Sequence, residues 1–120
     1  MILLNGSSLT IEQLVAVASR GETVAVSAEA ADRVRAARAI VERMAREDEP
    51  VYGINTGFGS FAEVKIAPEE LATLQRNLVR SHAAGVGEPL SVPSVRAAMA
   101  LRANVLAKGF SGIGSGRSRR

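Results

Sequence analysis

The chain of 120 residues is long enough for one domain, and its hydrophobic content of 47% is sufficient for a core and excludes global disorder. It contains no cysteine and one histidine, which excludes disulfides, thiolate metal sites and histidine-rich metal sites. No apolar run approaches the roughly 18 residues of a membrane span. No basic segment followed by an apolar stretch opens the chain, so we expect a cytoplasmic protein that does not bind membranes.

The formal net charge of +3 comes from the C-terminal end. Three of the 15 Lys and Arg residues lie within 114–120, which contains no acid, so residues 1–113 balance 12 basic against 12 acidic side chains. Binding to nucleic acid would therefore rest on the last seven residues alone, and the charge distribution argues against it. We expect residues 1–113 to form the folded domain and residues 114–120 to form a flexible basic tail.

The first 50 residues predict two short strands and two helices. A capping box marks the start of the first helix, because Thr10 is a suitable N-cap and Gln13 follows three residues later. Gly21 is a suitable end for that helix. Ser27 can cap the second helix, and Pro50 stops it because the residue before a proline avoids helical angles. The predicted ranges are 2–4 and 23–26 for the strands, and 10–20 and 28–48 for the helices.

A glycine-rich loop follows at residues 52–59, Tyr-Gly-Ile-Asn-Thr-Gly-Phe-Gly, and opens with the only tyrosine of the chain. A phosphate-binding loop would place a lysine at the start of a helix, but the next lysine is Lys65 and the next helix signal is Pro68. A phenol on such a loop can act as an acid or base in catalysis. The alternative is a structural loop whose Tyr52 covers a core, and the residues alone favour that alternative.

A third helix is predicted over residues 68–83. Pro68 suits its first position, and leucines at 71, 74 and 78 lie along one face. The next step of four residues reaches His82, the only histidine, near the helix end. Two interpretations remain open: a histidine packed at a helix C-terminus, where a positive charge is favoured, or a side chain that faces a pocket and hydrogen-bonds a substrate.

A fourth helix is predicted over residues 92–108, capped by Ser91 and ended by Gly109. Apolar residues occupy every face of it, which is typical of an enclosed helix. A chain of 120 residues has little material to enclose it, so we expect partners from a longer polypeptide or from other subunits. The predicted fold class is mainly α, with helices and two or three short N-terminal strands.

Two segments of the chain resemble the histidine ammonia-lyase family, one of the aromatic amino acid lyases and aminomutases. They are the octet 52–59 and the segment 77–87, Asn-Leu-Val-Arg-Ser-His-Ala-Ala-Gly-Val-Gly. The resemblance runs from the first predicted strand to about Ile113 and covers only the N-terminal part of a family chain. It implies the N-terminal part of the ammonia-lyase fold, a homo-oligomer, and deamination of L-histidine to urocanate and ammonia.

The resemblance also implies roles for individual residues. Tyr52 matches the family's catalytic tyrosine, the base that removes the β-proton, and His82 matches a residue that contacts the substrate side chain. Relatives acting on tyrosine or phenylalanine tend to have His-Leu or Phe-Leu where this chain has Ser81 and His82. A polar pair suits an imidazole, which needs hydrogen-bond partners once it leaves water, so histidine is the expected substrate. Gly59, in the same loop as Tyr52, is expected near the substrate.

The family's electrophile is a methylidene-imidazolone (MIO) ring formed from an internal Ala-Ser-Gly, and these 120 residues contain no such triad. Ser111-Gly112 follows Phe110, and Ser115-Gly116 follows Gly114. We therefore expect an N-terminal fragment of a histidine ammonia-lyase that carries no cofactor of its own and is inactive alone. The alternative is a non-catalytic truncated relative that associates with itself or binds other subunits through its apolar helices.

Overall fold

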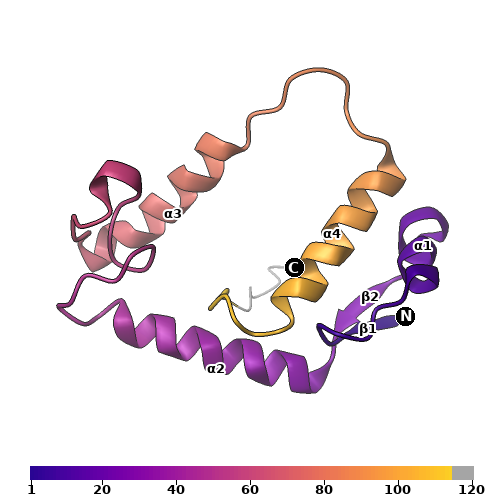
Figure 1. The fold of residues 1–120 in the computed structure, drawn as a ribbon, viewed down its shortest axis with the longest axis horizontal. Helices are drawn as coiled ribbons and strands as arrows, with labels where there is room; N and C mark the ends of the chain where they lie inside the picture. Colours follow the sequence, from indigo (N-terminus) through magenta and orange to yellow (C-terminus); the bar gives the residue numbers. More distant parts are fainter. Residues whose placement is uncertain (115–120) are drawn as a thin grey trace. The chain divides into compact units, whose positions relative to one another are not determined.

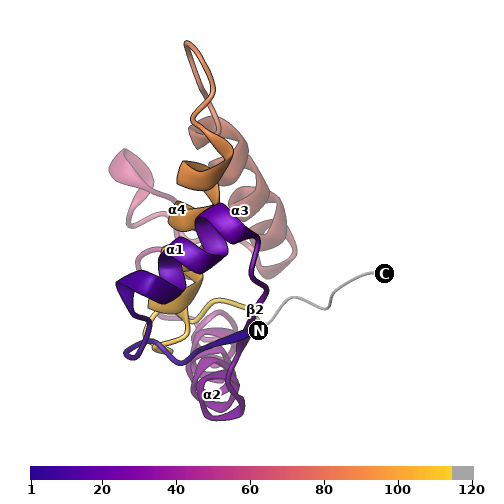
Figure 2. The same ribbon diagram turned by 90° about the vertical axis from the view of Figure 1, so that its right-hand side faces the viewer.

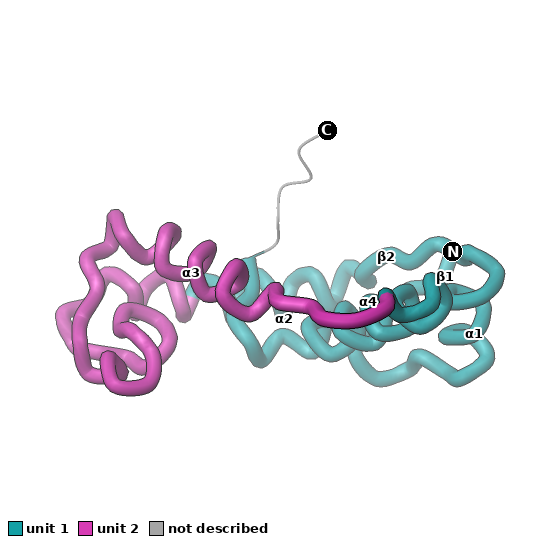
Figure 3. The backbone as a smooth tube through the Cα atoms, turned by 90° about the horizontal axis from the view of Figure 1, so that it is seen from above, with its two compact units in different colours: residues 1–39, 89–120 teal, residues 40–88 magenta. Residues whose placement is uncertain are grey.

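The computed structural model describes residues 1–114, which divide into two compact units. Of the described residues, one unit contains 1–39 and 89–114, and the other contains 40–88 (Figure 3). The predicted tail, 114–120, lies outside the described residues apart from Gly114.

The first unit begins with a two-stranded parallel sheet. Strand β1 (Ile2–Leu4) pairs with β2 (Val24–Val26), and α1 (Ile11–Arg20) connects them (Figure 1). The predicted capping box of α1 is confirmed: Gln13 N donates to Thr10 Oγ1 at 3.3 Å, and Thr10 N donates to Gln13 Oε1 at 3.1 Å. Gly21 ends the helix in the left-handed conformation, with φ of 74°.

Helix α4 (Val92–Leu106) packs against α1 (Figures 1 and 2). Small side chains allow the close approach, since Ala16 on α1 and Ala100 on α4 are both buried. Side chains also bond to the backbone across the unit: Arg96 Nε donates to Val17 O at 2.9 Å, and Gly6 N donates to Asn104 Oδ1 at 3.0 Å. The buried apolar residues of this unit are Leu4, Ala16, Val17, Ala30, Ala100 and Ala107.

The other faces of α4 leave large apolar side chains exposed. Met99 is 67% exposed, Val105 is 52% exposed and Leu101 is 47% exposed, and Val92 and Val95 are exposed as well. The sequence predicted apolar residues on every face of this helix, and the described residues enclose only part of it. This exposed apolar surface is the feature for which the sequence predicted missing partners.

Helix α2 (Ala28–Met44) starts as predicted, with Ala30 N donating to Ser27 Oγ at 3.2 Å, but it ends four residues before the predicted end at 48. Beyond Met44 the backbone continues in turns, in which Arg46 N donates to Arg43 O and Glu47 N donates to Met44 O. The side chain of Asn55 donates to Met44 O at 3.3 Å. Asn55, eleven positions downstream, thus hydrogen-bonds to the end of α2. The sequence near Met44 does not predict this helix end.

The second unit contains the glycine-rich loop, a 3₁₀ turn η1 (Gly59–Phe61) and helix α3 (Pro68–His82). An isolated antiparallel bridge joins Thr56 to Lys65 and closes the loop. The predicted leucine stripe is confirmed, because Leu71, Leu74 and Leu78 are half-buried while most of the other α3 side chains are exposed.

The architecture is mainly helical with one short two-stranded sheet, as the sequence predicted. The observed helices differ from the predicted ranges by one or two residues at their ends, except at the end of α2. Within residues 1–114, no helix combines the length and the apolar character needed to cross a membrane.

Candidate functional site

The glycine-rich loop is held by two buried polar side chains at its centre. Asn55 is 0% exposed and Thr56 is 1% exposed. Asn55 Oδ1 accepts from Val51 N at 2.7 Å, while its amide nitrogen lies within hydrogen-bond distance of three carbonyl oxygens, those of Met44, Glu47 and Glu49. Thr56 Oγ1 accepts from Gly53 N at 3.3 Å and donates to Gly57 O at 3.0 Å. These bonds satisfy the buried polar groups and fix the loop backbone.

Tyr52 projects from this loop with 65% of its surface exposed. Its ring meets the ring of Phe58 edge to face, with centroids 5.8 Å apart and planes at 78°. Within the described residues, the phenol therefore lies at the surface of the loop and is not buried in a core.

His82 is the last residue of α3, and its side chain is exposed. Its Nδ1 lies 2.8 Å from Leu78 O and 3.1 Å from Ser81 Oγ, which itself donates to Leu78 O at 2.8 Å. A carbonyl oxygen only accepts hydrogen bonds, so the contact with Leu78 O requires the proton on Nδ1. In the neutral ring this leaves Nε2 with a free lone pair that can accept a hydrogen bond from a ligand.

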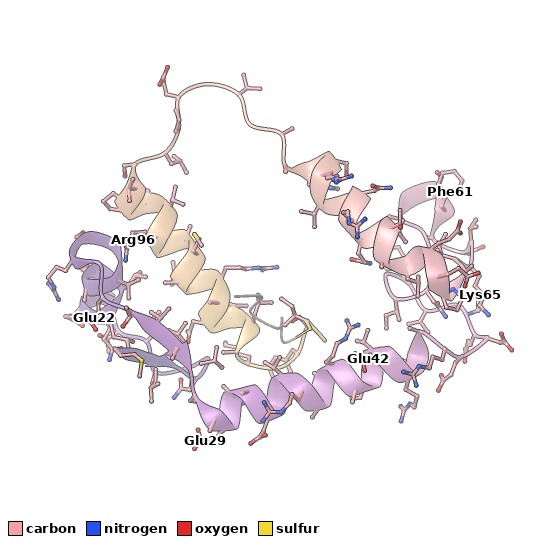
Figure 4. All side chains as sticks on the ribbon, turned by 180° about the vertical axis from the view of Figure 1, so that it is seen from behind. Glu22, Glu29, Glu42, Phe61, Lys65 and Arg96 are labelled. Carbon is pink, nitrogen blue, oxygen red and sulfur yellow. The ribbon has the colours of Figure 1, made fainter. Side chains whose placement is uncertain are left out.

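A cavity of about 370 Å³ lies between the loop and α3, and residues of both family-like segments line it. Phe58 and Phe61 line it from the loop, and Leu78 and Ser81 line it from the helix; Gly57, Ile66, Leu74 and Asn77 complete the wall. Figure 4 shows Phe61 and Lys65 on the loop segment beside α3. The walls are mostly apolar with a few polar groups, as in sites that bind small molecules.

The predicted site residues stand in different relations to this cavity. Ser81 lines it directly, whereas Tyr52, His82 and Gly59 are not among its lining residues. Tyr52 contacts the wall residue Phe58 through its ring, and His82 contacts the wall residue Ser81. Gly59 is exposed with φ of 59°, and the space that a side chain would occupy there is open.

Of the wall residues, sequence reasoning named only Ser81 as part of the site, and Phe58, Phe61 and Asn77 are among those that it missed. A signal for Asn77 exists, because Leu74, Asn77, Leu78 and Ser81 follow the helical spacing of one face. The two phenylalanines carry no such signal, since their placement depends on the turn at Gly59–Phe61.

An ion pair joins Lys65, at the end of the loop segment, to Asp48. Lys65 Nζ donates to Asp48 Oδ1 at 2.7 Å, and this hydrogen bond, together with the lysine charge, holds the pKa of Asp48 below its usual value. Among residues 1–114, no group of three or more His, Cys, Asp or Glu side chains is placed to hold a metal ion.

The cavity is mostly apolar, and two of its wall residues contact a phenol and an imidazole, an arrangement that can bind a small molecule. The chain belongs to the aromatic amino acid lyase family, whose pattern it matches over residues 9–116. This confirms the resemblance that the two segments indicated.

Named relatives make the comparison more specific. The histidine ammonia-lyase of Myxococcus xanthus is 56% identical over 112 residues, which cover 93% of this chain and 22% of the relative. The crystal structure of histidine ammonia-lyase from Trypanosoma cruzi superposes with a TM-score of 0.85 at 47% identity, over 95% of this chain and 22% of that one. The ergothionase of Treponema denticola superposes with a TM-score of 0.89 at 37% identity, over 95% and 23%. The chain therefore spans about a fifth of the length of these relatives.

Proposed function

We propose that this chain is the N-terminal portion of a histidine ammonia-lyase, carrying the base and one substrate contact of its active site. The observation that carries the proposal is the cavity whose two walls come from the two family-like segments, with Phe58 on one wall and Ser81 on the other. The identity of 56% to the Myxococcus xanthus enzyme supports histidine as the substrate.

The chain's own residues have distinct roles in this proposal. The exposed Tyr52 takes the β-proton of the bound amino acid. His82, protonated on Nδ1 against Leu78 O, offers Nε2 to an N–H of the substrate imidazole. The apolar wall at Phe58 and Leu78 excludes water from the ring of the substrate, and Gly59 leaves open space beside it.

The residues of this chain do not supply the electrophile of the family. That ring forms from an Ala-Ser-Gly, and no such triad occurs in the 120 residues. We therefore infer that the chain alone does not deaminate histidine. Purified chain incubated with L-histidine should produce no urocanate absorbance, and turnover by the isolated 120 residues would refute the inference.

A chimera tests the roles of Tyr52 and His82. Residues 1–113 replace the matching segment of the Myxococcus xanthus enzyme, and the chimera should release urocanate from histidine. Tyr52→Phe should lower kcat by about 10²–10⁴-fold, the usual contribution of a positioned acid or base. His82→Leu should act mainly on KM, because it removes a substrate contact. Thr73→Val, at an exposed α3 position, removes a hydroxyl elsewhere and should leave both constants unchanged. An active Tyr52→Phe chimera would reject the role of the phenol.

A second function is favoured by the exposed apolar side chains of α4. A chain with this surface can associate with a second copy or with other lyase subunits without catalysing a reaction. The oligomeric state of the chain separates this function from the first one.

A further inference from the structure

The backbone on both sides of Tyr52 is held by the two buried polar side chains of the loop. Val51, the residue before Tyr52, donates its N–H to Asn55 Oδ1 at 2.7 Å, and its carbonyl oxygen accepts from Asn55 N at 3.2 Å. Gly53, the residue after Tyr52, donates its N–H to Thr56 Oγ1 at 3.3 Å. Both neighbours of the tyrosine are therefore fixed from inside the loop.

The Tyr52 side chain has little else to place it. It is 65% exposed, and its one aromatic contact is the edge of Phe58. Where a side chain has few contacts of its own, the direction in which it points depends on its backbone. The position of the phenol is thus set mainly by the groups that hold Val51 and Gly53.

Asn55 anchors this arrangement to the end of α2. Its amide nitrogen lies 3.3 Å from Met44 O, 3.3 Å from Glu47 O and 3.0 Å from Glu49 O. A side-chain amide is required here, because one atom must donate to the carbonyl oxygens while the other accepts from Val51 N. A carboxylate of the same shape would keep the acceptor and place a second oxygen against the carbonyl oxygens, and an apolar side chain would leave the buried groups unpaired.

We propose that Asn55 is a positioning residue for Tyr52: it ties the tyrosine's backbone to the end of α2 and so fixes the phenol against Phe58, a wall residue of the cavity. Its relevance to catalysis rests on the proposed function, in which Tyr52 is the base. The placement of the Tyr52 ring by Asn55 does not rest on the proposed function, and it can be measured in the 120-residue chain.

The first test compares the same substitution at two asparagines. Asn55→Asp removes the amide N–H groups that donate to the carbonyl oxygens at the end of α2. Asn104→Asp is the control: Asn104 accepts from Gly6 N through Oδ1, and an aspartate keeps this acceptor. The readout is the proton NMR signal of the Tyr52 ring, which is assigned without ambiguity because the chain has one tyrosine, and which the edge contact with Phe58 displaces from free-tyrosine values. Asn55→Asp should return these signals to free-tyrosine values, and Asn104→Asp should leave them as in the parent chain.

A milder variant covers the case in which Asn55→Asp unfolds the second unit. Thr56→Val removes the acceptor of Gly53 N but leaves Asn55 in place, and it should shift the Tyr52 ring signals part of the way while the His82 imidazole signals stay. If Asn55 only stabilises the fold, Asn55→Asp lowers the unfolding midpoint but leaves the Tyr52 signals of the folded chain unchanged. That result would overturn the proposal, as would unmoved signals in both variants.

The histidine-deaminating chimera extends the test to catalysis. Asn55→Asp there should lower kcat by about 10²-fold with a smaller change in KM, the effect expected when a catalytic group is misplaced by about 1 Å. If Tyr52→Phe leaves the chimera active while Asn55→Asp still displaces the ring, the role of Tyr52 as base fails and the positioning by Asn55 stands. Displaced ring signals without any change in kcat, in a chimera that needs Tyr52, would overturn the catalytic importance of the positioning.

Discussion

At the scale of single residues, Gly57 shows why the loop needs glycine even where the backbone angles are ordinary. It is buried, and a Cβ atom at this position would lie 2.6 Å from Phe61 Cβ and 2.9 Å from Phe61 O. Neither atom can swing away, because one is backbone and the other is bonded to it. The glycine therefore permits the close approach of η1 that brings Phe61 to the cavity wall.

Gly57→Ala should destabilise the chain. Forcing a methyl group into this contact is an overpacking change, for which about 1–3 kcal/mol of lost unfolding free energy is expected. Gly85→Ala is the matched control, since a Cβ there meets nothing within 4 Å and the backbone is not left-handed; its effect should stay within about 0.5 kcal/mol. Urea unfolding followed by circular dichroism measures both, and equal midpoints for the two variants would contradict the close-approach argument.

The sequence predicted some roles at this scale and not others. Tyr52 and His82 were indicated by their segments, and the structure places each next to a wall residue of one cavity, Phe58 and Ser81. Asn55 lies within the predicted glycine-rich loop, but no role of its own was predicted for it. Its burial and its hydrogen bonds depend on the fold placing the carbonyl oxygens of Met44, Glu47 and Glu49 around its amide nitrogen. The periodicity of the sequence does not predict contacts between these segments.

At the scale of elements, the helix ends divide into two kinds. The ends of α1 were predicted correctly because Thr10, Gln13 and Gly21 act within a few residues of the backbone groups that they satisfy. The end of α2 was predicted wrongly, because Asn55 bonds carbonyl oxygens there from a distant part of the sequence. Local capping is readable from a sequence, whereas capping by a distant side chain requires the fold.

The ion pair between Asp48 and Lys65 links the segment after α2 to the segment before α3 and should make stability depend on pH. The folded pKa of Asp48 lies below its usual value, which is about 3.9 in an unfolded chain. A lowered carboxyl pKa contributes stability above the unfolded value, and the contribution disappears as the pH falls through the folded value. Asp48 is fully exposed, so the effect should be small and should weaken at high salt.

Asp48→Asn tests this link. In urea unfolding, the parent chain should exceed the variant in stability by a constant amount above about pH 5, and the difference should shrink toward zero as the pH falls below about 3.9. Glu49→Gln, which removes an exposed carboxylate in the same segment, is the control and should not reproduce this pattern. A parent-minus-variant difference that grows as the pH falls would mean that the lysine is not the cause of the lowered pKa.

At the scale of the whole molecule, the chain corresponds to 22% of the length of the Myxococcus xanthus enzyme and leaves much of α4 uncovered. The sequence predicted the uncovered helix, because a helix that is apolar on every face requires more material around it than a chain of 120 residues offers. It could not predict which faces the chain itself covers. The structure shows that Ala100 and Ala107 are buried, and that Met99, Leu101 and Val105 are exposed.

The exposed apolar side chains of α4 predict self-association. Leu101 and Val105 are four residues apart, so they lie on the same side of the helix, and covering them removes apolar surface from water. Light scattering after size exclusion should give a mass that rises with concentration for the parent chain and stays near the 12.6 kDa monomer for the double variant Leu101→Glu, Val105→Glu. Arg102→Glu introduces an acid at an exposed position between them in the sequence, and this variant should associate like the parent chain if the apolar surface is the cause.

A parent chain that stays monomeric at all concentrations and salt levels would reject the interaction module and leave the lyase segment as the remaining function. Equal loss of association in Arg102→Glu and the double variant would instead assign the contact to charge.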